Sequence, residues 1–179
     1  GSLEWEDSYK LTAQTEGVLS NIDFEIGDTV RKGVILAKID NPTNMVNTET
    51  AKEQLKITLE NLTSNSPALQ QLEQNIQFAE TKYKQDLLQA ERYQRLYKSQ
   101  SVAKSEVEKF ELAAESSLSN LKALKKNYAQ LQQQAQQNYI STKGQLKVNE
   151  VAQKYNNIMV PQNGTVIGKL KTNGDFVRK

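Results

Sequence analysis

The side chains that could carry out chemistry in this chain are few in kind. Its 179 residues include no cysteine and no histidine, so thiolate nucleophiles, imidazole general bases and the common zinc ligands are missing. Carboxylate, hydroxyl and lysine groups remain, and their spacing indicates neither a catalytic site nor a metal site. We therefore expect a protein that is not an enzyme and that needs no cofactor.

The balance of charge limits the class of partner. Lysine and arginine together number 23 and aspartate and glutamate 21, and both signs are spread along the chain instead of forming a basic patch. Nucleic acid is therefore not an expected partner. The hydrophobic fraction of 37% is low, which argues against a thick globular core throughout the chain.

The rest of the chain is organised around a long segment, residues 42–156, that is typical of two helices folded back on each other. No glycine occurs between Gly33 and Gly144, and few globular segments of that length lack turn residues so completely. Apolar side chains recur at alternating steps of three and four residues, which keeps one seam of a helix against a partner. The two predicted seams are Leu69, Leu72, Ile76, Ala79, Tyr83, Leu87, Ala90 and Tyr97, and Val107, Phe110, Ala114, Ser117, Leu121, Leu124, Tyr128, Leu131 and Ala135. A polar stretch near residues 98–104 separates the seams and predicts the bend.

Local signals predict where these helices begin and break. Asn41 is a good N-cap and Pro42 suits the first helical position. Pro67 lacks an N–H donor and disfavours helical geometry at Ser66, so we expect the first limb to break there, with Ser66 capping a new helix. The second limb contains no breaker and extends to about Lys154.

Short β segments flank the helices, and they contain an internal repeat. The β signals lie at residues 9–13, 17–22, 29–30 and 34–39 before the helices, and at 157–161 and 164–168 after them. At one constant offset, Gly17, Gly27, Asp28, Val30, Arg31 and Lys32 fall on Gly164, Gly174, Asp175, Val177, Arg178 and Lys179. Gly-Asp followed by an apolar residue suits a tight turn that leads into a strand. We therefore predict two quasi-symmetric halves of one module that share a core of Leu19, Ile22, Val30, Leu36, Val166, Leu170 and Val177.

This order of parts resembles the membrane fusion proteins, or periplasmic adaptor proteins, of the haemolysin-D type. Residues 17–40 and 158–179 are similar to the two halves of that family's lipoyl (biotinyl-like) domain, and Val-Pro-Gln-Asn-Gly at 160–164 stands where the family has Ala-Pro-x-x-Gly. The resemblance implies an α+β fold, in which a long antiparallel α-helical hairpin (coiled coil) is inserted between two halves of a small lipoyl-like β-sandwich. The implied lipoyl turn glycines are Gly17, Gly27, Gly164 and Gly174.

The resemblance also implies domain boundaries. The first lipoyl half would span residues 3–41, the hairpin 42–156 and the second lipoyl half 157–179. A strand equivalent to residues 33–40 is expected to follow the second half.

The predicted bend carries a motif that is similar to the family's tip signature of Arg, then Leu four residues on, then Ser seven residues after that. The matching segments are Arg-Tyr-Gln-Arg-Leu at 92–96 and Val-Ala-Lys-Ser-Glu at 102–106. The resemblance implies that Arg92, Leu96 and Ala103 bind a partner, with Arg92 and Leu96 projecting outward. Ala103 stands at the family's serine position, so a hydroxyl that could cap the second helix is missing, and Ser101 is the other candidate for that cap.

By the same resemblance, the chain is part of a periplasmic adaptor subunit of a tripartite efflux or type I secretion system. The full-length protein would be periplasmic or extracytoplasmic and anchored to the inner membrane. It would form a homo-oligomeric ring, commonly of six, that links an inner-membrane transporter to an outer-membrane TolC-like channel through the hairpin tip.

Three alternatives remain. The chain could be a Gram-positive membrane fusion protein that serves an exporter without an outer-membrane channel. It could be a structural coiled-coil scaffold without a transport role. It could also be a lipoyl carrier domain, because Glu-Thr-Ala-Lys at 49–52 weakly matches a lipoylation site, although Lys52 is expected in a helix and not at an exposed turn.

Overall fold

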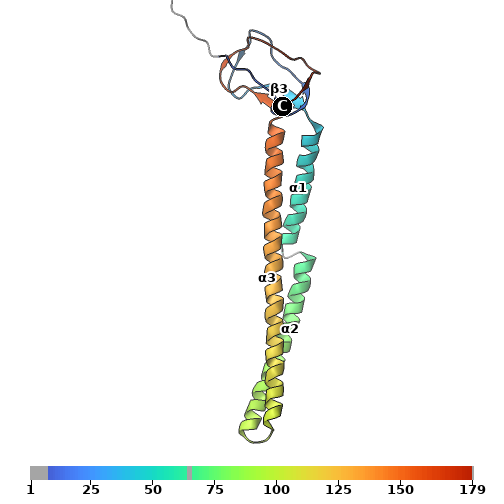
Figure 1. The fold of residues 1–179 in the computed structure, drawn as a ribbon, viewed down its shortest axis with the longest axis vertical. Helices are drawn as coiled ribbons and strands as arrows, with labels where there is room; N and C mark the ends of the chain where they lie inside the picture. Colours follow the sequence, from blue (N-terminus) through green and yellow to red (C-terminus); the bar gives the residue numbers. More distant parts are fainter. Residues whose placement is uncertain (1–7, 64–65, 179) are drawn as a thin grey trace, which may run out of the picture. The chain divides into compact units, whose positions relative to one another are not determined.

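A computed structural model describes residues 8–63 and 66–178 of the chain. The chain divides into two compact units, of which one comprises Gly1–Gln54 with Lys143–Lys179 and the other Leu55–Thr142. The first unit contains all six described strands together with the helical ends next to them, and the second contains helices alone (Figure 1). The fold is therefore α+β.

Three helices form where the turn-poor segment predicts them: α1 (Pro42–Leu62), α2 (Pro67–Lys98) and α3 (Lys104–Lys154). The predicted start at Pro42 and end at Lys154 are confirmed. At the start of α1, the Asn41 side-chain oxygen accepts a hydrogen bond from the Asn44 backbone N–H at 3.0 Å, which satisfies one of the free donors of the first turn.

The predicted break before Pro67 is also confirmed, but the predicted cap is not. Ser66 immediately precedes α2 and has an extended backbone, yet its side chain makes no capping hydrogen bond. Its residue is buried instead, and its carbonyl accepts the backbone bond of Gln70 at 3.0 Å. Pro67 at the first helical position has no N–H to satisfy, so the helix begins there without the hydroxyl.

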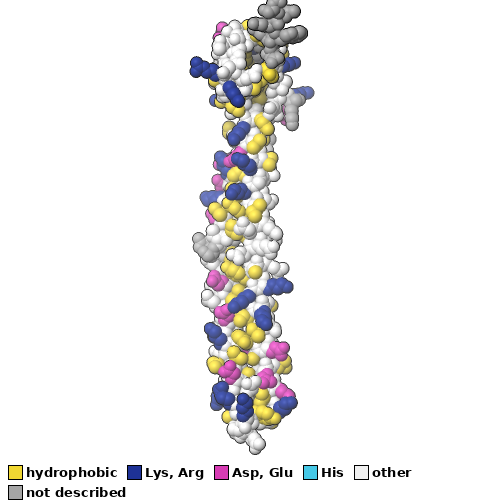
Figure 2. All heavy atoms as spheres, turned by 90° about the vertical axis from the view of Figure 1, so that its left-hand side faces the viewer, with side chains coloured by type: hydrophobic (Ala, Val, Ile, Leu, Met, Phe, Trp, Pro, Cys, Tyr) yellow, Lys and Arg dark blue, Asp and Glu magenta, His cyan; other side chains and the backbone are white. Residues whose placement is uncertain are grey.

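Within the unit Leu55–Thr142, α2 and α3 pack antiparallel through the predicted seams. The buried side chains are Leu69, Ala79 and Ala90 on α2, and Val107, Ala114 and Leu121 on α3. The ammonium of Lys125 on α3 lies 2.6 Å from the carboxylate of Glu80 on α2 and lowers the pKa of Glu80 through a hydrogen bond and through its charge. Basic and acidic side chains are interspersed along the helices (Figure 2), as the composition predicts.

The seam of α2 departs from the prediction near its end. Tyr97 and Leu87 were placed in the seam, but both are exposed, whereas Tyr93 and Leu96 are half-buried. A strict seven-residue step does not match 3.6 residues per turn, so a contact line drifts by about 20° per heptad along a straight helix. This drift is the physical reason that the packing residues at the end of α2 lie before Tyr97.

Six short strands build the β part: β1 (Gly17–Ser20), β2 (Thr29–Val30), β3 (Ile35–Asp40), β4 (Asn157–Met159), β5 (Gly164–Thr165) and β6 (Phe176–Val177). They form one sheet in the order β4-β3-β1-β6 and a second in the order β2-β5, with every pairing antiparallel. Each sheet combines strands from both sides of the helices. The prediction that the two β segments lie in contact is therefore confirmed, but the β signal at residues 9–13 was wrong, because no strand forms there.

The internal repeat is matched by equivalent hydrogen bonds. In both copies the glycine of the Gly-Asp turn has a positive φ, 102° at Gly27 and 91° at Gly174, a conformation that glycine adopts without a steric cost. Each turn is bonded to the other copy's strand in the same way. The four backbone bonds run from Gly27 N to Val166 O (2.8 Å), from Val166 N to Asp28 O (2.9 Å), from Gly174 N to Leu19 O (2.8 Å) and from Leu19 N to Asp175 O (2.9 Å).

The core of the β part is small, and it matches the prediction only in part. Buried residues Leu19, Ala37, Ile39 and Val177 form a cluster, with Ala13, Ile22 and Ile158 packed against it. Leu36 is buried, and Val30 and Val166 are half-buried. Leu170 was predicted in the core but is 80% exposed, because it lies between β5 and β6 in a segment that no strand covers.

Asp28 and Asp175 hold the two turns in the same manner, and a pH-dependent prediction follows for Asp175. Its carboxylate accepts the Thr172 backbone N–H at 2.8 Å, which is the main cause of its lowered pKa. A carboxylate whose pKa is lowered by folding stabilises the fold above its unfolded pKa, and this stabilisation is lost as the pH falls through the folded value.

Asp175→Ala is therefore expected to lower the melting temperature at pH 7. The difference from the parent chain should shrink as the pH falls below the ordinary value of 3.8. Circular dichroism melts over a pH series measure this. Asp23→Ala is the matched control, because Asp23 is exposed and its carboxylate makes no hydrogen bond within the described residues. A difference that stays constant with pH would contradict the prediction.

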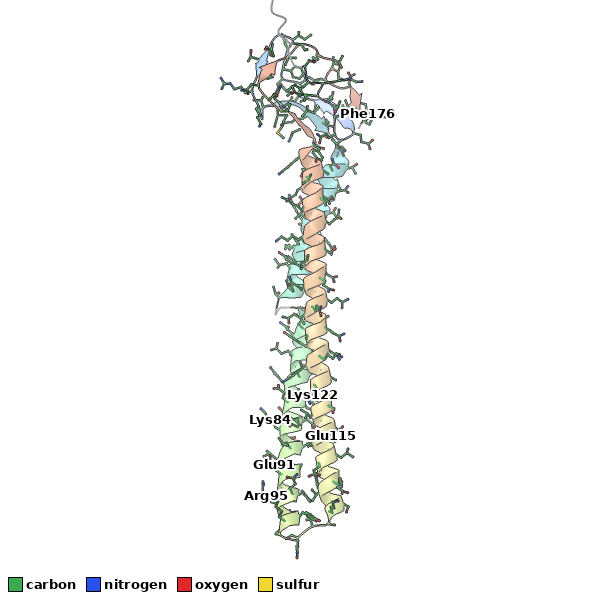
Figure 3. The ribbon with its side chains drawn as sticks, turned by 60° about the vertical axis from the view of Figure 1, so that its left-hand side comes forward. Lys84, Glu91, Arg95, Glu115, Lys122 and Phe176 are labelled. Atoms are coloured by element: carbon green, nitrogen blue, oxygen red, sulfur yellow. The ribbon has the colours of Figure 1, made fainter. Side chains whose placement is uncertain are left out.

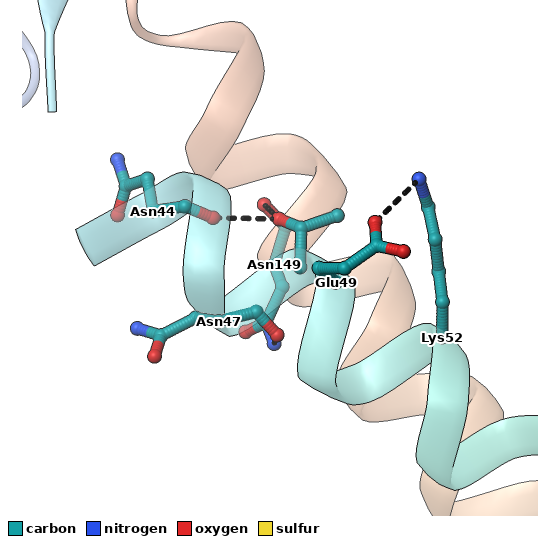
Figure 4. A network of polar contacts seen from close by, with 6 residues as sticks. Asn44, Asn47, Glu49, Lys52 and Asn149 are labelled. Atoms are coloured by element: carbon teal, nitrogen blue, oxygen red, sulfur yellow. Dashed lines mark hydrogen bonds and ion pairs between the residues drawn. The ribbon is translucent and has the colours of Figure 1, made fainter. Parts of the chain in front are cut away.

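A polar network replaces the apolar seam where α1 and α3 meet the β part. The hydroxyl of Thr48, which is 2% exposed, donates to the Asn44 carbonyl at 2.8 Å and lies 3.4 Å from the Asn149 carbonyl. The Asn149 side chain donates to the Asn47 carbonyl at 3.0 Å (Figure 4). Because every buried side-chain polar atom among the described residues has a partner, the network fixes the register of the two helices at their β ends.

Candidate functional site

The bend between α2 and α3 is closed by a regular helix-terminating turn. Beyond Lys98, the Ser101 N–H bonds to the Leu96 carbonyl at 2.9 Å and the Gln100 N–H to the Tyr97 carbonyl at 2.8 Å, which is the pair of bonds that defines a Schellman motif. Gln100 has a φ of 57°. This left-handed position usually takes glycine, and a residue with a Cβ is strained there by about 1 kcal/mol. The absence of glycine hid the turn type from sequence reasoning.

Aromatic and polar contacts hold the two helices together beside this bend. The rings of Tyr93 and Phe110 stack with centroids 4.0 Å apart and an interplanar angle of 27°. The Gln94 side-chain amide donates to the Glu111 carboxylate at 2.6 Å. Phe110 belongs to the predicted seam, whereas Tyr93 and the Gln94–Glu111 pair were not predicted. The bend is thus a firm end of the hairpin in its own unit.

Of the three predicted partner-binding residues, Arg92 and Ala103 are exposed and Leu96 is half-buried. The expectation that Leu96 projects outward is therefore wrong, because its position packs toward the seam and its carbonyl closes the turn. Within residues 8–63 and 66–178, Arg92 makes no hydrogen bond or ion pair. Its five N–H donors are available to acceptors on another molecule.

The start of α3 lacks a side-chain cap. Ala103 immediately precedes Lys104, the first residue of α3, and its carbonyl accepts the Glu106 N–H at 3.1 Å. Ser101 was the other candidate for the cap, but its hydroxyl lies 3.0 Å from the Ser99 hydroxyl and does not reach the first turn of α3. Position 103 is therefore the capping position.

Ala103→Ser is expected to stabilise the unit that contains the bend by about 0.5–1 kcal/mol, because the new hydroxyl can accept an N–H of the first turn. Urea denaturation of both chains measures the change. Ser101→Ala is the control: it removes a hydroxyl from the bend without touching the cap. No stabilisation by serine at 103 would show that the first turn of α3 does not need a side-chain acceptor.

Lys52 does not have the geometry of a lipoyl carrier. It lies inside α1, and its ammonium is 3.6 Å from the Glu49 carboxylate in an exposed ion pair (Figure 4). A carrier lysine must stand at the end of an exposed turn to reach other enzymes. The residues around Lys52 form an ordinary solvated helix face.

Two further surveys bear on the class of protein. Over the described ranges, no three histidine, cysteine, aspartate or glutamate residues come close enough to hold a metal ion. None of the helices in the described part of the chain is long and apolar enough to cross a membrane.

A helical hairpin whose flanking strands pair with each other across it defines a class of protein. Residues 8–179 match the model of the family described as "RND MFP, barrel-sandwich hybrid domain". The chain therefore belongs to the RND membrane fusion protein (MFP) family. Comparison with the curated protein sequences gives no match. Members of this family are periplasmic adaptors of efflux and secretion systems.

Solved structures of three proteins share the fold at low identity. The periplasmic adaptor protein EmrA matches at 18% identity and a TM-score of 0.54, over 98% of this chain and 70% of its own. A MacA-MexA chimeric protein with the Pseudomonas aeruginosa MexA α-hairpin domain matches at 22% and 0.54, over 94% and 40%. The soluble domain of LipC, a membrane fusion protein of a type I secretion system, matches at 15% and 0.53, over 96% of both chains.

Proposed function

We propose that this chain is the hairpin-bearing part of a periplasmic adaptor subunit that links an inner-membrane transporter to an outer-membrane TolC-like channel. The observation that carries the proposal is the exposed Arg92 beside a firmly closed bend. A guanidinium offers several donors in a fixed plane, which suits it to the carbonyls and carboxylates of a partner's helix ends. The position of Ala103 at the same bend adds a small, exposed surface that allows close approach.

We also propose the organisation of the domains. Residues 3–41 and 157–179 would be the two halves of a lipoyl-like β-sandwich, with the hairpin of residues 42–156 inserted between them. The support is the equivalent hydrogen bonding of the repeat copies, in which each Gly-Asp turn is bonded to a strand of the other half. The full-length protein would be anchored to the inner membrane and act without catalysis.

Side-by-side contact between copies in a ring has its own support in the unit Leu55–Thr142. Residues 61–72 and 127–142 carry no charged side chain, and both segments line one cavity of about 180 Å³. Exposed amides both donate and accept hydrogen bonds, so the same surface on a second copy can meet it without repulsion between like charges. This uncharged belt is suited to weak, polar contacts between copies.

The experiment that tests the channel role is site-specific photo-cross-linking from the bend in intact cells. A photoreactive amino acid at position 103 of the full-length protein is expected to form an adduct with the outer-membrane channel. The same amino acid at Lys122, which lies on α3 further from the bend (Figure 3), is the control and should give no such adduct. Equal adducts from both positions would contradict docking through the bend.

A second function is favoured by one observation, the lack of a hydroxyl at Ala103, where the tip signature has serine. A membrane fusion protein of a Gram-positive cell serves an exporter without an outer-membrane channel, and its bend would not need that group. If position 103 gives adducts with no outer-membrane protein in cells that possess such channels, this second function replaces the first.

A further inference from the structure

The two copies of the repeat do not have the same neighbours. Strand β1 lies between β3 and β6, whereas β5 pairs with β2 alone. The repeat places β5 on β1 and β2 on β6, and the pairing agrees: Gly17 is opposite Val177, and Gly164 is opposite Val30. The place that β3 occupies beside β1 therefore has no counterpart beside β5, and one edge of β5 is unpaired.

Burial shows the consequence of this asymmetry. Leu19 in β1 is buried, but its repeat equivalent Val166 is only half-buried. Beyond β5, Ile167 and Leu170 are 76% and 80% exposed. Ile158, in the strand on the other side of β3, packs against the core, whereas its equivalent Leu11 is 41% exposed. These apolar residues border the unpaired edge of β5.

The glycines of the repeat point to what is absent. A Cβ on Gly17 would lie 2.5 Å from the Asp40 carbonyl oxygen and 2.6 Å from a methyl carbon of Ile39, so β3 approaches β1 as closely as only glycine allows. Gly164 occupies the equivalent position, and a Cβ there would meet nothing within 4 Å. The sequence has the glycine in both copies, but a close-packed strand is present at only one of them.

We propose that the unpaired edge of β5 binds an extended strand with the chemistry of β3, antiparallel to residues 164–167 and between them and residues 10–12. Main-chain hydrogen bonds to the edge would supply affinity, as in other cases of strand addition. Apolar side chains at the positions of Ala37 and Ile39 would cover Val30 and Val166, as they cover Leu19 and Val177 in the first copy. Residues 9–13 form no strand in the structure because their neighbour is this missing strand. The proposal is independent of the adaptor function.

The test supplies such a strand in register. Residues 33–40 (Gly-Val-Ile-Leu-Ala-Lys-Ile-Asp) follow Lys32, and the repeat equivalent of Lys32 is Lys179, so this octapeptide is appended directly after Lys179. Hydrogen exchange followed by mass spectrometry is expected to show amides of residues 10–12 and 165–170 exchanging at least about tenfold more slowly than in the parent chain. A control extension has aspartate at the positions of Ala37 and Ile39 and should give no protection.

A second arm uses the glycine. Gly164→Ala is expected to leave the melting temperature of the parent chain unchanged, because its Cβ enters open space. In the extended chain the same substitution should lower the melting temperature and remove the protection, because the Cβ then meets the added strand. Three results would overturn the proposal: no protection by the extension, equal protection by the aspartate control, or tolerance of Gly164→Ala in the extended chain. Protection of residues 165–170 in the parent chain only at concentrations where it dimerises would assign the edge to a second copy instead.

Discussion

Replacing Arg92 by aspartate in the full-length protein is expected to abolish transport while the isolated chain keeps its fold. Arg92 is exposed and makes no hydrogen bond or ion pair within the described residues, so its loss removes no contact that stabilises the hairpin. A carboxylate in its place would repel the carbonyl and carboxylate oxygens that a guanidinium binds. Complementation of a transport-deficient strain measures the first effect, and a thermal melt of the isolated chain measures the second.

Lys122→Asp is the matched control for Arg92→Asp. It reverses a charge on an exposed helix position that lies further from the bend than the labelled Arg95 (Figure 3), and transport should continue. Leu96→Ser is a less specific probe, because Leu96 is half-buried and serine there should lower stability as well as docking. Normal transport by the Arg92→Asp protein would show that the bend does not dock through this residue.

Gly17→Ala is expected to give the largest loss of stability of any single methyl group added to the described glycines. The new Cβ would lie 2.5 Å from the Asp40 carbonyl oxygen and 2.6 Å from the Ile39 side chain, so β1 and β3 would have to separate at one end of their pairing. Overpacking of this kind costs about 2–4 kcal/mol. Urea denaturation, followed by a probe in the β part, measures the change.

Gly164→Ala is the control that the repeat itself provides. The residue type, the repeat position and the added group are the same, but a Cβ at 164 meets nothing within 4 Å. The control should therefore stay within about 0.5 kcal/mol of the parent chain, as surface substitutions usually do. Equal losses at 17 and 164 would mean that the cost comes from the turn chemistry of the repeat and not from the approach of β3.

The helices were predictable because their signals are local. The position of Asn41 before Pro42, the proline at 67 and the steps of three and four residues each act within one or two helical turns, and the observed bounds follow them. The errors occurred where a second element decides. Tyr97 was placed in the seam by counting, but Tyr93 packs on Phe110, because the partner helix selects which side of a drifting stripe is covered.

The β part shows the same division between local and distant causes. The sequence by itself determined that two Gly-Asp turns exist and that they are equivalent, because the need for a positive φ belongs to the residue and its neighbours. Only the tertiary structure decided that each turn bonds to the other copy's strand, that Leu170 stays exposed, and that Gly17 is crowded where Gly164 is not. Strand pairing joins residues more than a hundred positions apart, and burial depends on whether a neighbouring strand is present. A repeat in the sequence can indicate equal turns, but it cannot show which of two equal edges is covered.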